Sequence, residues 1–152
     1  MPDKPPKPAS PSRPRQGATR PRRGRAPQAT ILVVDDEAAV RETIIEALGI
    51  YGYRVVAAAS VEAAEAAKER LGVAGIQLAI LDVHLTPGPQ TRAGYALAQR
   101  WRALHPGLPI MLISGDPSNQ DLPEVHAGDM RFLLKPFRMD VFLDAVRDAL
   151  GR

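Results

Sequence analysis

Residues 31–40 read ILVVDDEAAV: four apolar residues, three adjacent carboxylates and a return to apolar residues. The run ILVV is short and partly β-branched, as buried strands of parallel sheets are. Carboxylates crowded at the end of such a strand raise one another's pKa unless a cation compensates. The stretch therefore predicts a buried strand that ends either at a cation site or in side chains that point apart.

Four more apolar runs have the same character, and segments with helical spacing separate them. The predicted strands are residues 31–34, 54–59, 76–81, 108–113 and 131–134. The predicted helices are residues 37–50, 61–72, 92–104 and 138–150, with Ser60 as an N-cap. Residues 116–129 are interrupted by Pro117, Pro123 and Gly128, so this segment is expected to be irregular. Alternating strands and helices predict an α/β fold with a doubly wound parallel sheet.

The basic charge of the chain is concentrated at its start. Residues 1–28 hold eight lysines and arginines against one aspartate, and 8 of the 15 prolines. A segment so poor in large apolar residues cannot offset the entropy of ordering, so we expect a disordered basic tail followed by one domain at 29–152. Three interpretations of the tail stay open: a solvated extension, a start site assigned too early, or weak binding of polyanions such as nucleic acid.

The composition also bears on location. The 152 residues include no cysteine, so disulfides and cysteine-bound metals are excluded. No apolar run approaches the roughly 18 residues of a membrane span, and the N-terminus lacks the apolar core of a secretory signal. These observations predict a cytoplasmic protein.

Polar residues follow four of the predicted strands: Asp35 with Asp36, Asp82, Ser114 and Lys135. Taken singly, each has an ordinary explanation as a helix cap, a turn residue, a loop hydroxyl or a solvated charge. Taken together, they lie at the carboxyl ends of strands, where open α/β sheets bind ligands. Carboxylate oxygens are the ligands that Mg²⁺ prefers, and one divalent ion offsets the repulsion.

Four motifs carry a family resemblance: VVDDE (33–37), LAILDVHL (78–85), ISG (113–115) and LLKPF (133–137). In this order and at these separations, they resemble the receiver domain of bacterial two-component response regulators, of the single-domain chemotaxis type. The resemblance covers about residues 30–152. It implies a flavodoxin-like sheet of five parallel strands in the order 2-1-3-4-5.

The resemblance implies a role for each motif residue. Asp82 is expected to be the phosphate acceptor, and Asp35, Asp36 and the backbone carbonyl of His84 are expected to hold Mg²⁺ with it. Lys135 is expected to pair with the phosphoryl group.

Ser114 is expected to bind a phosphoryl oxygen and to form the conformational switch together with Phe132. For Phe132, the alternative of an ordinary half-buried strand aromatic stays open. The bond before Pro136 is expected to be cis.

The function implied is phosphorylation by a sensor histidine kinase or histidine phosphotransfer protein, with signalling by a conformational switch. We expect no output domain in this chain, and no enzymatic turnover beyond its own phosphorylation and dephosphorylation. The alternative is a phosphorylation-independent scaffold with the same fold. A dehalogenase-type phosphatase needs a second aspartate where this chain has His84, and a dinucleotide module needs a glycine-rich loop after the first strand.

The sequence departs from the family after the acceptor position. The segment HLTPGPQTRAG (84–94) is about four residues longer before Gly94 than the family's usual loop. Because this insertion borders the site, it is expected to alter partner choice or access of water.

Overall fold

The computed structural model describes residues 29–85 and 92–151. Both the predicted tail (1–28) and most of the longer loop (86–91) lie outside the described residues, so the predictions about them stay open. Within the described part of the chain, every helix is too short or too polar to cross a membrane.

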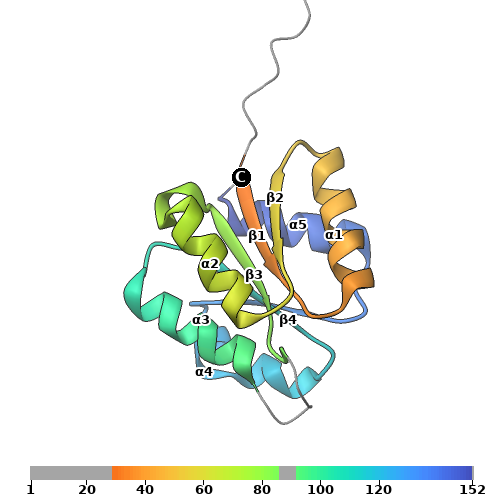
Figure 1. Ribbon diagram of the computed structural model, residues 1–152. Helices are drawn as coiled ribbons and strands as arrows, with labels where there is room; N and C mark the ends of the chain where they lie inside the picture. The colour runs from red at the N-terminus through yellow and green to blue at the C-terminus, as the bar shows by residue number, and fades with distance from the viewer. Residues whose placement is uncertain (1–28, 86–91, 152) are drawn as a thin grey trace, which may run out of the picture.

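Five parallel strands form one sheet in the order β2-β1-β3-β4-β5, which confirms the predicted fold (Figure 1). Along the chain the elements are β1 (Thr30–Val34), α1 (Ala38–Ile50), β2 (Arg54–Ala58), α2 (Val61–Leu71), η1 (Val73–Gly75), β3 (Leu78–Asp82), α3 (Ala93–Leu104), β4 (Ile110–Ser114), η2 (Pro117–Asp121), α4 (Pro123–His126), β5 (Arg131–Leu134) and α5 (Met139–Ala149). The predicted N-cap is confirmed, since the Ser60 Oγ accepts a hydrogen bond from the Ala63 N–H at 3.1 Å.

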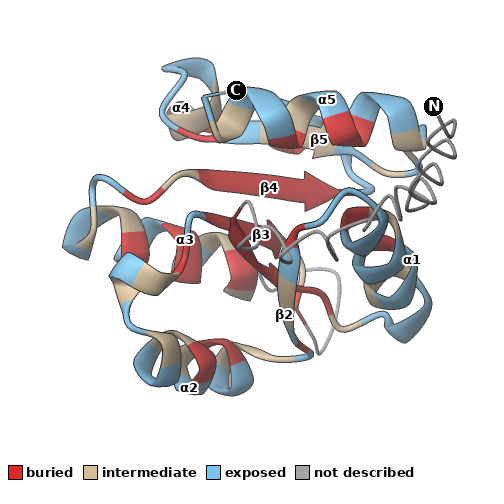
Figure 2. Cartoon of the chain, turned by 90° about the horizontal axis from the view of Figure 1, so that it is seen from above, coloured by how far each residue is buried: buried red, intermediate tan, exposed pale blue. Residues whose placement is uncertain are grey.

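Two apolar cores cover the two faces of the sheet, because successive side chains of a strand point to opposite faces. On one face, Leu32 and Leu81 pack with Trp101 of α3 and with alanines of α2. On the other, Ile31 and Ile80 pack with residues of α1 and α5. Figure 2 shows the buried residues in the central strands and on the helix surfaces turned toward them. The three central strands, β1, β3 and β4, are buried throughout and are therefore almost entirely apolar.

The segment between β4 and β5 is irregular, as its prolines predicted. It contains only η2 and the four-residue helix α4. A polar cluster ties α4 to α3: the Tyr95 hydroxyl donates to the Glu124 carboxylate, and the Gln99 amide donates to both side chains. Burial and then Glu124 raise the pKa of Tyr95 to about 12, so the phenol stays a donor at neutral pH. This cluster holds a helix that is too short to be stable alone.

Replacing Tyr95 by Phe is expected to loosen the segment that includes α4. Loss of the hydroxyl removes the donor to Glu124 while the ring keeps its packing, so amide exchange in residues 123–130 should accelerate about fivefold, the scale of one net hydrogen bond. Hydrogen exchange followed by mass spectrometry measures this. Tyr51→Phe is the matched control, because the exposed Tyr51 ring keeps its contact with Arg147. Equal exchange in the two variants would contradict the prediction.

Candidate functional site

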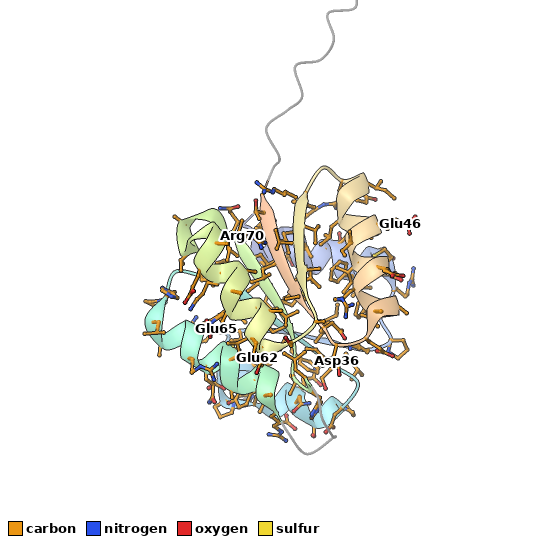
Figure 3. The ribbon with its side chains drawn as sticks, viewed as in Figure 1. Asp36, Glu46, Glu62, Glu65 and Arg70 are labelled. Atoms are coloured by element: carbon orange, nitrogen blue, oxygen red, sulfur yellow. The ribbon has the colours of Figure 1, made fainter. Side chains whose placement is uncertain are left out.

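The strand register brings the predicted site residues to one edge of the sheet. Val34 is level with Leu81, so Asp35 and Asp82 emerge side by side. Asp82 is level with Ile113, and Ser114 is level with Leu134. Lys135 follows, and its N–H donates to the Ser114 carbonyl at 2.8 Å. Figure 3 labels Asp36 at this edge, which is the end of the sheet away from the start of β1.

Asp35 is fully buried and its hydrogen-bonding groups are held on several sides. Its Oδ1 accepts from the Glu37 N–H at 2.9 Å, and its Oδ2 accepts from the Lys135 Nζ at 2.9 Å. Its backbone carbonyl accepts from Arg41 Nη1 at 2.7 Å. The structure places Glu37 at the N-cap position of α1, so the alternative that Asp36 caps this helix is wrong.

Asp82 ends β3 and shares Lys135 with Asp35. Its Oδ2 accepts from the Lys135 Nζ at 3.0 Å, while its Oδ1 accepts from the His84 N–H at 3.1 Å. Lys135 therefore bridges two carboxylates that come from different strands. Glu37 lies farther from the same ammonium, with Oε2 4.0 Å away from the Nζ.

The ionisation of this group follows from its burial and its charges. Burial raises the pKa of Asp82, and the neighbouring Asp35 adds to the rise, although Lys135 opposes it. Burial works to lower the pKa of Lys135, but its bonds to Asp35 and Asp82 outweigh burial, and the pKa of Lys135 is raised. The site thus holds a permanent ammonium beside a carboxylate whose charge is only partly compensated.

The site has the composition of a Mg²⁺ site. Carboxylate oxygens of Asp35, Asp36 and Asp82 lie within 4.8 Å of one another. One lysine against three carboxylates leaves an excess of negative charge, which a hard divalent cation neutralises. Both oxygens of Asp35 and both oxygens of Asp82 already accept hydrogen bonds, whereas Asp36 is half-exposed. The residues therefore fit the ion, with Asp36 the most available ligand.

The remaining predicted residues lie on β4, on β5 and in the turn after β5. Ser114 is buried at the end of β4, and the Lys135–Pro136 peptide bond is cis, as predicted. Phe132 is half-buried in β5 and packs against the core on the α2 and α3 face. That position suits both a switch residue and an ordinary strand aromatic, so its role stays a prediction.

One residue that the sequence did not indicate belongs to this neighbourhood. Asn119 is fully buried, and its Nδ2 donates to the Ser114 Oγ at 2.8 Å. The same nitrogen lies 3.2 Å from the His84 Nε2, so the His84 ring, for which mainly a backbone role was expected, also belongs to this neighbourhood. Asn119 sits in a polar run, PSNQD, that has no apolar periodicity. The sequence pattern of this segment therefore does not distinguish a buried polar side chain from the solvent-exposed side chains of an ordinary loop.

The comparisons with known proteins agree with the observed fold. Residues 31–147 match the family described as the response regulator receiver domain. The chain therefore belongs to the receiver domain family of two-component response regulators.

Two relatives of this chain are a response regulator and a regulatory protein. The response regulator protein FleR of Pseudomonas aeruginosa is 33% identical over 126 residues, which are 82% of this chain and 25% of FleR. The regulatory protein VirG of Agrobacterium tumefaciens is 30% identical over 79% of this chain and 43% of VirG. This chain thus spans between a quarter and a half of the length of these relatives.

Solved structures show the same architecture. A CheY-like receiver domain protein from Methanospirillum hungatei superposes with a TM-score of 0.69 at 26% identity, covering 81% of this chain and 94% of that one. NtrX from Brucella abortus gives a TM-score of 0.69 at 29% identity, covering 81% of this chain and 27% of NtrX.

Proposed function

We propose that Asp82 accepts a phosphoryl group from a phosphohistidine of a sensor histidine kinase or histidine phosphotransfer protein, in a Mg²⁺-dependent reaction. The observation that carries this proposal is the half-buried ammonium of Lys135, which contacts both Asp82 and Asp35 at the acidic edge of the sheet. Phosphoaspartate then signals through a change in the surface around Ser114 and Phe132.

The proposed step is a displacement at phosphorus. A carboxylate oxygen of Asp82 forms the new O–P bond as the N–P bond of the donor breaks, and the electron pair returns to the imidazole nitrogen. Bound Mg²⁺ supplies charge neutralisation for the transferred group. Lys135 places its ammonium beside the developing acyl phosphate. Asp35 holds Lys135 there while Asp82 reacts, since both carboxylates contact the same Nζ.

A groove beside the site suits the partner that this proposal requires. It has a volume of about 420 Å³ and lies between α1 and the loop after β5. Its lining includes Val40, Ile44, Phe137 and Met139, with Lys135 at one end. Apolar side chains next to the reacting groups offer a surface on which a protein that carries the phosphohistidine can rest.

Wild-type protein is expected to gain the mass of one phosphoryl group when it is incubated with acetyl phosphate and Mg²⁺. Acetyl phosphate transfers its phosphoryl group without a partner protein, so the test isolates the chemistry of this chain. Intact-mass spectrometry measures the gain, and a parallel sample with chelator should gain none. A protein that stays unlabelled with Mg²⁺ and an active donor supports the phosphorylation-independent scaffold instead.

Asp36→Asn is expected to weaken Mg²⁺ binding by at least about tenfold, because even outer partners of metal ligands contribute on that scale. Labelling should slow at low Mg²⁺ and recover as Mg²⁺ is raised. A Mg²⁺ titration of the labelling rate measures both effects. Asp148→Asn on the exposed face of α5 is the control for the loss of one negative charge. Unchanged Mg²⁺ dependence in Asp36→Asn would remove Asp36 from the ligand set.

A further inference from the structure

Asn119 is a buried amide in an otherwise exposed segment. The residues of η2 on either side of it, Ser118 and Gln120, are exposed, whereas the Asn119 side chain is fully enclosed. Burying an amide is unfavourable unless hydrogen bonds replace those that water made. The contacts of Asn119 therefore show why it points inward.

A tight turn brings Asn119 back onto Ser114. The Asp116 Oδ1 accepts from the Ser118 N–H at 2.9 Å and from the Ser118 hydroxyl at 2.8 Å, which fixes the start of η2. The Asn119 N–H then bonds the Asp116 carbonyl at 3.2 Å. This turn places the amide of Asn119 against the hydroxyl five positions earlier in the chain.

The contacts of Ser114 decide what its hydroxyl can do. The Oγ accepts from the Asn119 Nδ2 at 2.8 Å and from the Asp116 N–H at 3.0 Å. A hydroxyl has two acceptor positions and one proton. With both acceptor positions filled, the Ser114 proton is left free to donate, which is the property that binding of a phosphoryl oxygen requires.

The second contact of Asn119 leads back to the acceptor. Its Nδ2 faces the His84 Nε2 at 3.2 Å, and the His84 N–H donates to the Asp82 Oδ1 at 3.1 Å. Within the described residues, the His84 Nδ1 and the Asn119 Oδ1 are buried without a hydrogen-bond partner. Asn119 therefore contacts both the Ser114 hydroxyl and the residue whose backbone N–H bonds the Asp82 carboxylate.

We propose that Asn119 is a positioning residue that orients the Ser114 hydroxyl as a donor toward a phosphoryl group on Asp82, with His84 in contact with the same amide nitrogen of Asn119. The proposal rests on the phosphoacceptor function proposed above and extends it to a residue that does not itself touch Asp82. Without the amide, the hydroxyl is free to turn its proton elsewhere, and binding of the phosphoryl group weakens.

Beryllofluoride, a phosphoryl analogue that binds aspartate carboxylates with Mg²⁺, provides an equilibrium test on the full chain. Asn119→Leu keeps the branched shape and removes the amide, and Asn119→Ala is a second variant in case the larger side chain does not fit. Titration followed by ¹⁹F NMR is expected to show affinity lower by about tenfold, the scale of one well-placed hydrogen bond. Gln120→Ala, an exposed neighbour, is expected to bind as wild type does.

The same substitution in a Ser114→Ala background separates positioning from general damage. If Asn119 acts through the hydroxyl, Asn119→Leu should cause no further loss of affinity once Ser114 is gone. A tenfold loss in both backgrounds overturns the proposal, and so does an unchanged affinity in the single variant. Wild-type protein that binds no beryllofluoride at all overturns the phosphoacceptor function, and this inference with it, so the two failures are distinguishable.

Discussion

Replacing Asp82 by Asn is expected to abolish the gain of one phosphoryl mass upon incubation with acetyl phosphate and Mg²⁺. The amide has nearly the shape of the carboxylate but lacks its nucleophilic oxygen, and Asp35 still holds Lys135. Intact-mass spectrometry measures the result, with Asp148→Asn as a control that should be labelled normally. If Asp82→Asn still gains a phosphoryl group, another residue is the acceptor.

The same variant is expected to be no less stable than wild type in metal-free buffer at neutral pH. Because burial raises the pKa of Asp82, the folded state favours the neutral form of this side chain. The stabilisation that comes from the neutral Asp82 carboxyl is lost as the pH rises through the pKa that this group has in the folded protein. The amide introduced by Asp82→Asn stays neutral at every pH, so the variant does not lose this stabilisation. The stability difference should therefore shrink as the pH is lowered toward the acid range, where Asp82 is protonated. Thermal melts across pH measure it, and a much lower midpoint for Asp82→Asn at neutral pH would contradict this account.

Gly94→Ala is expected to be the most damaging single methyl addition near the site. A Cβ built at Gly94 lies 1.6 Å from the carbonyl oxygen of Asp82 and 2.8 Å from its carbonyl carbon. Both atoms belong to the backbone of β3, so one of the two chain segments has to shift. Strain of this kind is expected to lower the free energy of unfolding by about 4 kcal/mol or more. The midpoint of thermal unfolding should fall by about 10 °C or more. The protein that still folds should gain little phosphoryl mass from acetyl phosphate, because Asp82 is displaced.

Gly49→Ala is the matched control for that experiment. Gly49 lies within α1, and a Cβ there meets no heavy atom within 4 Å. Alanine in a helix is favoured over glycine by roughly 0.5–1 kcal/mol, so this variant should melt at or above the wild-type midpoint. Thermal melting with circular dichroism compares the two. Similar thermal unfolding midpoints for Gly94→Ala and Gly49→Ala would contradict the prediction, because they would show that the backbone near Asp82 adjusts to the added methyl group without loss of stability.

The sequence predicted the fold well because strands buried on both faces are apolar throughout. Runs such as ILVV stand out from the charged helices that flank them, and the polar residues directly after them mark the edge of the sheet. Asp35, Asp82 and Lys135 are therefore found by position alone. Their mutual contacts follow from parallel register, which places the ends of neighbouring strands at one level.

Contacts made by short irregular segments could not be predicted in this way. Asn119 is buried because a turn of η2 returns it to Ser114, and nothing in the letters PSNQD distinguishes it from its exposed neighbours. The pairing of Tyr95 with Glu124 joins residues 29 positions apart through side chains alone. Such pairings depend on how two elements sit against each other, which periodicity does not encode.

The lysine bridge joins the proposed phosphoacceptor to parts of the chain that are far apart in the sequence. Lys135 and Asp35 are 100 positions apart, and Lys135 and Asp82 are 53 apart. In the folded protein, pairing of β1, β3, β4 and β5 in one sheet brings these distant residues together. A chain emerging from the ribosome thus presents its carboxylates early but acquires the ammonium only when β5 joins the sheet. The phosphoryl transfer proposed for Asp82 needs both groups, so its complete site exists only in molecules that have finished folding.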